Sequence, residues 1–189
     1  SGKADLKLSE NLYDISKLNA VEEKKVETNQ YMQNAIRAAR DLEFLDVALD
    51  RLQNLTIKLQ ELAVESSNDL LSQTERERFI LDAQGLKKEF FDLSNQNDSF
   101  GNSLFGGVSG SKNPFVMDNS GAVSYEGSAI NREVKVSPSL HVRQNFSGLE
   151  IFNNIKNGEG KTTIFQIIDD YISSLGTDLN SGKSSNLFF

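Results

Sequence analysis

The stretch Leu45–Leu93 contains LDVALDRLQNLTIKLQEL (residues 45–62) and, after a polar break, FILDAQGLKKEFFDL (residues 79–93). In both segments apolar residues recur at steps of three and four, which places them on one side of an α-helix. Because each apolar side must be covered by another helix, two segments of similar length predict a helical hairpin. The apolar positions are Leu45, Ala48, Leu52, Leu55, Leu59, Leu62, Phe79, Ala83, Leu86, Phe90 and Leu93.

The break between the two helices is marked by residues that favour helix ends. The run Ser66–Asp69 is Ser-Ser-Asn-Asp, and these residues are poor helix formers. Ser72 and Glu75 have the spacing of a capping box, in which a hydroxyl and a carboxylate bind the free amides at the start of a helix. We therefore expect the second helix to begin near Gln73.

Residues 10–40 carry a weaker apolar pattern with charged residues between the apolar ones. A helix here could cover one side of the hairpin. The alternative is that a helix outside this sequence covers it. The apolar positions of the segment are Leu12, Ile15, Leu18, Val26, Tyr31, Ala35 and Ile36.

The composition changes near Asn95, from helix-forming residues to a region rich in Gly with short alternating stretches. Alternation indicates strands, and the turn sequence Asp118–Gly121 predicts a hairpin between Phe115–Met117 and Ala122–Tyr125. Further short strands are expected over Glu133–Val136 and Leu140–Phe146. The sequence thus predicts an α+β fold with a small sheet.

A last helix is expected near residues 162–175. Its apolar residues have helical spacing, Thr162 is placed to cap its start, and Gly176 is placed to end it. We expect this helix to pack on or beside the sheet. Its apolar residues are Ile164, Ile167, Ile168, Tyr171, Ile172 and Leu175.

Charge and composition exclude several partner classes. The 189-residue chain has a formal net charge of -7, no Cys and one His. A nucleic acid or an anionic membrane surface requires a basic face, so neither is expected as a partner. No apolar run approaches the roughly 20 residues of a membrane-spanning helix. Without Cys there is neither a disulfide framework nor a thiolate metal site.

Possible catalytic motifs do not satisfy the geometry that their chemistry needs. Gly158–Thr163 contains a Gly-Lys-Thr step, but Ile155 stands where a phosphate-binding loop needs Gly. The adjacent pairs Glu22-Glu23 and Asp169-Asp170 point about 100° apart on a helix and do not converge. His141 has no nucleophile pattern near it and is expected at the surface. We therefore predict no catalytic, cofactor-binding or metal-binding residues and no enzymatic activity.

The sequence motifs of the helical region, and their order, resemble those in the N-terminal part of the helical core domain of bacterial flagellins. The resemblance is carried by Glu61–Asn68, by Phe90, Phe91 and Leu93 of the second helix, and by Asn97-Asp98. Beyond them the chain is similar to the hook-associated proteins of type 3, the family at the hook–filament junction, and these segments are not expected in a filament flagellin. They are Ser103–Gly107, Pro114-Phe115, Tyr125–Gly127 and Asn145–Phe152.

The resemblance implies an elongated helical-hairpin domain similar to the D1 domain of flagellins, over residues 1–100. Residues 101–189 would form most of a β-rich outer domain that carries the last helix. The C-terminal return helix and both terminal coiled-coil segments of the family would be absent from this sequence. We therefore expect the chain to stay monomeric or weakly associated and not to form filaments.

The resemblance also implies a function without catalysis or cofactors. Members of the family are exported unfolded by the flagellar type III secretion system and assemble outside the cell. Expected partners are other hook-associated protein and flagellin subunits, further copies in a ring, and an export chaperone that binds the absent C-terminal region. The alternatives that remain are a filament flagellin and a non-flagellar helical interaction module.

Subunit contacts are expected on the exposed flanks of residues 37–64. In flagellins the corresponding helix contacts neighbouring subunits and an innate immune receptor. Gln60 and Val64 stand where flagellins have a recognition Arg and a Leu, and because an amide cannot replace a guanidinium, immune recognition is not carried over. The candidate interface residues are Arg37, Arg40, Arg51, Lys58, Gln60 and Val64.

Overall fold

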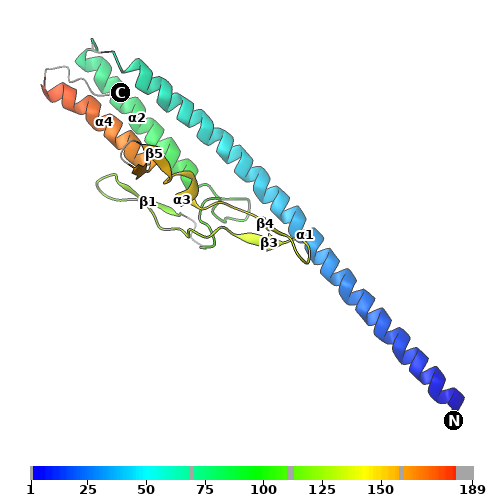
Figure 1. Ribbon diagram of the computed structural model, residues 1–189. Helices are drawn as coiled ribbons and strands as arrows, with labels where there is room; N and C mark the ends of the chain where they lie inside the picture. Colours follow the sequence, from blue (N-terminus) through cyan, green and yellow to red (C-terminus); the bar gives the residue numbers. More distant parts are fainter. Residues whose placement is uncertain (1, 69, 110–112, 158–159, 182–189) are drawn as a thin grey trace. The chain divides into compact units, whose positions relative to one another are not determined.

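The structure is a computed structural model that describes residues 2–68, 70–109, 113–157 and 160–181 (Figure 1). The described residues group into two compact units. Unit 1 comprises those of residues 1–40 and 133–144, and unit 2 those of residues 41–132 and 145–189. This grouping does not follow the expected boundary at residue 100, and the division into domains 1–100 and 101–189 stays a prediction.

The first helix, α1 (Gly2–Glu65), is uninterrupted. Residues 10–40 are helical, as expected, but they continue into the same helix as residues 41–65, which leaves no turn that would fold them back onto the hairpin. Of the two alternatives for covering the hairpin, a helix outside this sequence therefore stays a prediction. No Gly or Pro occurs between Glu10 and Leu45, and nothing else in this segment favours a helix end. The helix therefore continues until the polar residues after Glu65.

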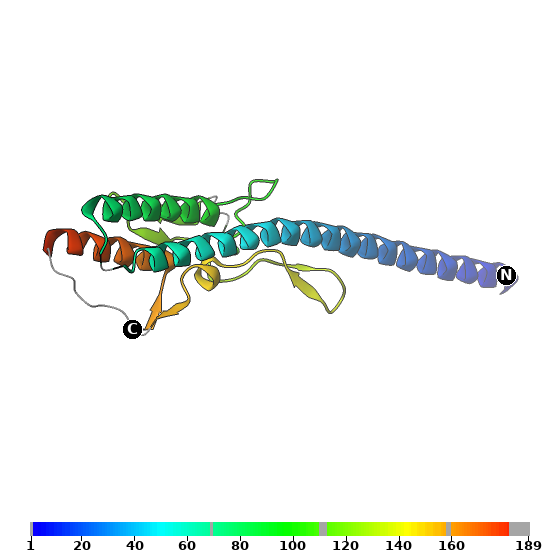
Figure 2. The same ribbon diagram turned by 90° about the horizontal axis from the view of Figure 1, so that it is seen from above.

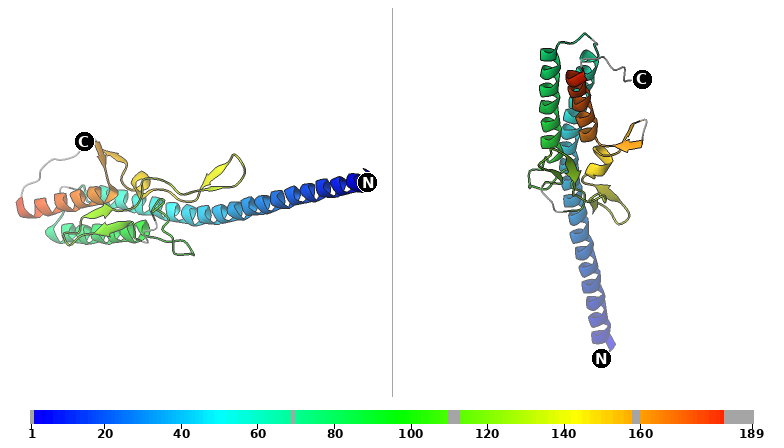
Figure 3. Two further views of the ribbon diagram at one scale, coloured as in Figure 1. Left: turned by 90° about the horizontal axis from the view of Figure 1, so that it is seen from below. Right: turned by 90° about the vertical axis from the view of Figure 1, so that its left-hand side faces the viewer.

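The predicted helical hairpin is confirmed within unit 2. Helix α2 (Gln73–Ser94) begins at the expected residue, and Ser72 and Glu75 form the capping box. The Ser72 hydroxyl oxygen accepts from the Glu75 N–H, and the Glu75 carboxylate accepts from the Ser72 N–H at 2.8 Å. Figures 1 and 3 show α2 beside the second half of α1. The two apolar sides share one core cluster, which includes Leu45, Ala48, Leu55, Leu59, Ala83, Leu86, Phe90 and Leu93.

A third helix, α4 (Ile164–Ser181), completes the bundle by packing along α2. Two details of this helix differ from expectation. Thr163, rather than Thr162, caps the helix, since its Oγ1 accepts from the Gln166 N–H at 3.0 Å. Gly176 does not end the helix, because Leu175 is buried and the cost of Gly inside a helix is only about 1 kcal/mol.

Two polar contacts hold α4 in place. Lys87 of α2 is mostly buried, and its Nζ donates to Asp169 Oδ1 of α4 at 2.5 Å and to the Gly121 carbonyl at 2.6 Å. On α4 the Tyr171 Oη lies 2.7 Å from Ser66 Oγ, at the end of α1. Burial is the main reason that the pKa of Tyr171 is raised. The ammonium group of Lys87 thus connects α2 with both α4 and the β1–β2 turn.

We expect Lys87→Met to lower the free energy of unfolding by about 1–3 kcal/mol, because Asp169 and the Gly121 carbonyl lose their donor. The loss is limited because the Asp169 side chain is 35% exposed and water can bind it. Urea unfolding followed by circular dichroism measures the change. Lys88→Met is the matched control, since the neighbouring Lys88 is exposed and should change stability by no more than about 0.5 kcal/mol. Equal losses in the two variants would contradict this role for Lys87.

Within the described residues, the strands form three separate two-stranded antiparallel sheets rather than one small sheet. In unit 2, β1 (Phe115–Met117) pairs with β2 (Val123–Tyr125) through the predicted turn, in which Gly121 has φ 87°. A second hairpin, β5 (Ile155–Asn157) with β6 (Gly160–Thr162), lies where only a loop was expected; residues 158–159 of the Gly158–Thr163 motif lie outside the described residues. Helix α3 (Gly148–Ile151) was also not expected (Figure 2).

Buried aromatic rings fasten the loops of unit 2 to the bundle. Phe115 of β1 lies 5.1 Å from Phe152 and 5.7 Å from Phe165 of α4, measured between ring centroids. Phe105 contacts Phe152 edge to face at 5.1 Å. Gly148 has no space for a side chain, because a Cβ would meet the Phe115 ring at 2.5 Å. The last helix therefore packs on α2 and against Phe115 of β1. The expectation that it packs on or beside a sheet is confirmed in part, because its main contact is with a helix.

The loop after α2 is closed by the Asp98 carboxylate. Its Oδ1 accepts from the N–H groups of Phe100 at 2.8 Å and Asn102 at 2.9 Å. Burial of the carboxyl raises its pKa and is the largest single effect. The hydrogen bonds from Asn102 and Phe100, together with the nearby Arg132 charge, outweigh burial, so the pKa of Asp98 is lowered from 3.8.

This shift predicts how stability responds to acid. Because the pKa of Asp98 is lower in the folded than in the unfolded chain, its contribution is complete above the ordinary value of 3.8 and is lost as the pH falls through the folded pKa. We expect Asp98→Asn to remove that part of the acid dependence. Unfolding free energies of both proteins between pH 6 and pH 2 test this, and parallel curves would contradict it.

Unit 1 contains the first part of α1 and one hairpin, β3 (Glu133–Lys135) with β4 (His141–Arg143). Both strands are shorter than expected. Asn34 Nδ2 donates to the Lys135 carbonyl at 2.8 Å, and Lys135 Nζ lies 5.8 Å from the centre of the Tyr31 ring. His141 is exposed on β4, as predicted. The hairpin therefore covers the side of α1 that carries Tyr31 and Asn34.

Candidate assembly surface

The candidate interface residues in unit 2 are exposed but do not form one surface. Arg51 and Lys58 lie on the same side of α1, since they are two turns apart. Gln60 follows Lys58 by two residues and points about 200° away from it around the helix axis. Val64, with 73% of its surface exposed, lies one turn after Gln60. The structure thus places Arg51 and Lys58 together on one side of α1, and Gln60 and Val64 together on another.

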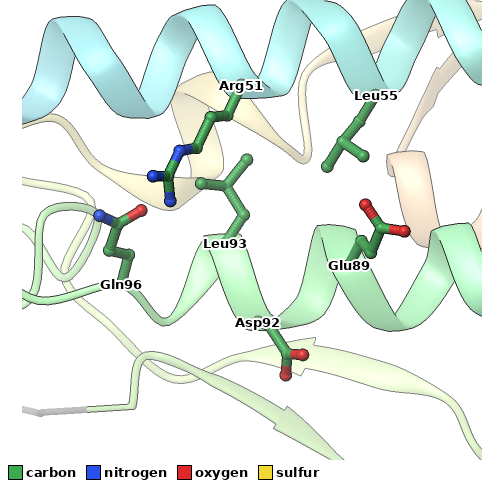
Figure 4. A pocket seen from close by; sticks show the side chains of 6 residues that line it. All are labelled: Arg51, Leu55, Glu89, Asp92, Leu93 and Gln96. Carbon is green, nitrogen blue, oxygen red and sulfur yellow. The ribbon is translucent and has the colours of Figure 1, made fainter.

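Arg51 borders a shallow open groove between α1 and α2, with a volume of about 380 Å³ (Figure 4). Leu55 and Leu93 form its apolar floor and are nearly fully buried. Figure 4 shows Arg51 pointing from α1 toward α2, whereas Asp92 points away from α1. Glu89 and Gln96 complete the lining. The groove offers an apolar strip between opposite charges, which suits a protein surface better than an enclosed small molecule.

In unit 1, Arg37 and Arg40 are both exposed on α1. The same part of the helix exposes many apolar side chains on the sides that β3–β4 does not cover. Six of them point within about 90° of the direction opposite to Tyr31 and Asn34. This part of α1 therefore has an apolar side with no partner among the described residues of unit 1. The six are Ile15, Leu18, Val21, Val26, Met32 and Ile36.

The outer side of α2 was missed by the sequence reasoning. Leu81 is 66% exposed on it, and Gly85 follows one turn later in the middle of the helix. A Cβ at Gly85 would meet nothing within 4 Å. The sequence did contain a signal for this exposed side, because Leu81 and Gly85 both lie outside the apolar spacing that predicts the buried side of the helix.

The described residues present no arrangement typical of catalysis or metal binding. Among them no group of three or more His, Asp or Glu side chains could hold a metal ion. The adjacent carboxylates do not converge: Asp169 binds Lys87, whereas Asp170 accepts from Gln166 at 2.8 Å. Within the described helices, none is long and apolar enough to span a membrane.

The fold therefore defines a class of α+β protein in which a helical bundle carries small β-hairpins and exposes the flanks of its helices. No protein-family model matches the chain. Its sequence is 23% identical to flagellar hook-associated protein 3 of Escherichia coli K12 over 192 residues, which cover 97% of this chain and 60% of that protein. The chain thus spans about 60% of the length of the curated relatives that it matches.

Solved structures that resemble this chain are also of flagellar hook-associated proteins. FlgL of Xanthomonas campestris matches with a TM-score of 0.69 and 29% identity, over 72% of this chain and 44% of that one. Flagellar hook-associated protein 3 of Legionella pneumophila matches with a TM-score of 0.70 and 26% identity, over 76% and 43%. The resemblance to hook-associated proteins of type 3 and the α+β fold with a helical hairpin are confirmed.

Proposed function

We propose that this chain is part of a structural subunit of the bacterial flagellum, located at the junction between hook and filament. The observation that carries the proposal is the sequence match to flagellar hook-associated protein 3 along 97% of the chain. A flagellar junction protein of Legionella pneumophila is among the structures with this fold.

The function proposed is mechanical linkage without an enzymatic step. Partners would be other hook-associated protein and flagellin subunits, with further copies in a ring and an export chaperone bound to a C-terminal region outside this sequence. The subunit would act outside the cell after export by the flagellar type III secretion system. Two uncovered surfaces support binding as the activity: the groove beside Arg51, and the apolar side of α1 in unit 1.

Within this proposal, the basic pair Arg51 and Lys58 contacts a neighbouring subunit. The chain as a whole is acidic, with a net charge of -7, so an exposed basic flank is complementary to most of the surface of another copy. Gln60 and Val64 would serve a second contact on the other flank of α1. Arg37 and Arg40 would serve a third, in unit 1.

Immunogold electron microscopy of intact flagella, with an antibody raised against this chain, tests the location. We expect gold particles only at the hook–filament boundary. Label along the filament would favour a filament flagellin instead, and no label on any flagellum would favour a non-flagellar interaction module. Antibody absorbed beforehand with the pure chain controls for unspecific label.

The contact surface has a separate test in the source bacterium. We expect the double substitution Arg51→Glu and Lys58→Glu to leave the fold intact, because both side chains are exposed, and to remove the label from the junction. Lys156→Glu with Lys161→Glu reverses two exposed charges on the β5–β6 hairpin and is the matched control. Normal label in the first variant would exclude this flank of α1 as a contact.

A further inference from the structure

The β3–β4 hairpin of unit 1 lies against α1 without burying any residue of its strands or turn. From Glu133 to Arg143 every residue is at least partly exposed, and Leu140 in the turn keeps 54% of its surface. Figures 1 and 2 show the hairpin beside α1. A hairpin of two strands is marginally stable in water unless it packs against another element. The order of this hairpin therefore depends on its contacts with α1.

Two contacts of Lys135 join the hairpin to α1. The Asn34 side-chain amide donates to the Lys135 carbonyl at 2.8 Å, and the Lys135 ammonium lies 5.8 Å from the centre of the Tyr31 ring. Tyr31 also donates to the Glu27 carboxylate, which is the largest cause of the lowered pKa of Glu27, and the charge of Lys135 lowers it further. Because all these side chains are partly or largely exposed, water competes with each contact and the strength of each is small.

The base of the hairpin is fastened separately, inside unit 2. Asn145 is fully buried, accepts from the Arg132 N–H at 2.8 Å and donates to the Gly107 carbonyl at 2.8 Å. The Ser147 N–H donates to the Asn131 side chain at 2.6 Å. These bonds hold together the segments by which the chain enters and leaves the hairpin, and none of them involves α1. We therefore expect them to stay closed when the hairpin leaves α1.

The β1–β2 hairpin of unit 2 is attached more firmly, although it has the same three residue pairs as β3–β4. Phe115 of β1 is 2% exposed and packs against Phe152 and Phe165. The Asn95 side chain binds both the N–H and the carbonyl of Phe115. Of two hairpins of equal length, one is thus attached by buried rings and the other by exposed polar groups.

We propose that residues 133–143 form a strap that reversibly leaves α1 while the bonds at its base stay closed. The closed strap covers the side of α1 that carries Tyr31 and Asn34, and the open strap exposes that side to other protein surfaces. Such an opening costs far less free energy than global unfolding, because it exposes no buried side chain of the strap. The strap would thus regulate access to one side of α1. It is independent of the proposed flagellar location, and failure of either proposal would leave the other untouched.

Hydrogen exchange of the folded chain, followed by NMR, tests whether the strap opens on its own. We expect the amides of β3 and β4 to exchange at least about a hundredfold faster than those of β1 and β2, because exchange reports the free energy of local opening. The Arg132 and Ser147 N–H groups at the base should keep the protection of β1–β2. Equal protection of the two hairpins, or exchange of the base together with the strap, would overturn the inference.

Asn34→Leu tests whether α1 closes the strap, since it removes the donor to Lys135 and keeps the size of the side chain. We expect exchange in β3 and β4 to rise about threefold to tenfold, the effect of losing one hydrogen bond, with no change in β1 and β2. Asn29→Leu is the matched control, because it makes the same replacement at an exposed position that points about 140° away from Asn34. Equal exchange in the two variants would show that this side of α1 does not hold the hairpin, and would exclude the strap.

Discussion

The structure of unit 2 depends on one constraint, which is that the apolar sides of three helices must be buried against one another. Leu55 of α1, Phe90 of α2 and Ile168 of α4 belong to a single buried cluster. Within unit 2 these helices depend on one another, because amphipathic helices in proteins gain most of their stability from packing. Phe115 of β1 and Phe152, which follows α3, add rings to the same cluster, so this region is stabilised by the bundle rather than by its own short strands.

Polar contacts define how the elements of the bundle are positioned against one another, which apolar packing alone would not determine. Lys87 connects two helices and a turn, and Tyr171 connects α4 to the end of α1. Asn95 serves β1 in the same way, because its side-chain amide accepts from the Phe115 N–H and donates to the Phe115 carbonyl. Each contact joins segments that are distant in the sequence. They therefore fix how the elements fit, which burial does not determine.

Elements with strong local signals could be predicted from the sequence. The capping box at Ser72 and the turn at Asp118–Gly121 each depend on residues close together in the chain, and both lie as expected. The position of α4 could not be derived, because periodicity gives an apolar side but no partner for it. The β5–β6 hairpin could not be predicted, because each of its strands has only three residues, which is too short to show an alternating pattern. The candidate contact residues remain predictions, and the division of Arg51 and Lys58 from Gln60 follows only from helix geometry.

The pairing of the strands has a kinetic consequence. Each strand pairs with the next strand in the sequence, so every loop that closes is short. Chains dominated by such local contacts have low contact order and fold quickly, since little entropy is lost before the first contacts form. Unit 2 also contains contacts that are not local: α4 joins α2 only after about seventy intervening residues have been arranged, and the bridge between Gly106 and Ser147 also closes a long loop. We therefore expect the packing of the last helix to be a slow event in the folding of unit 2.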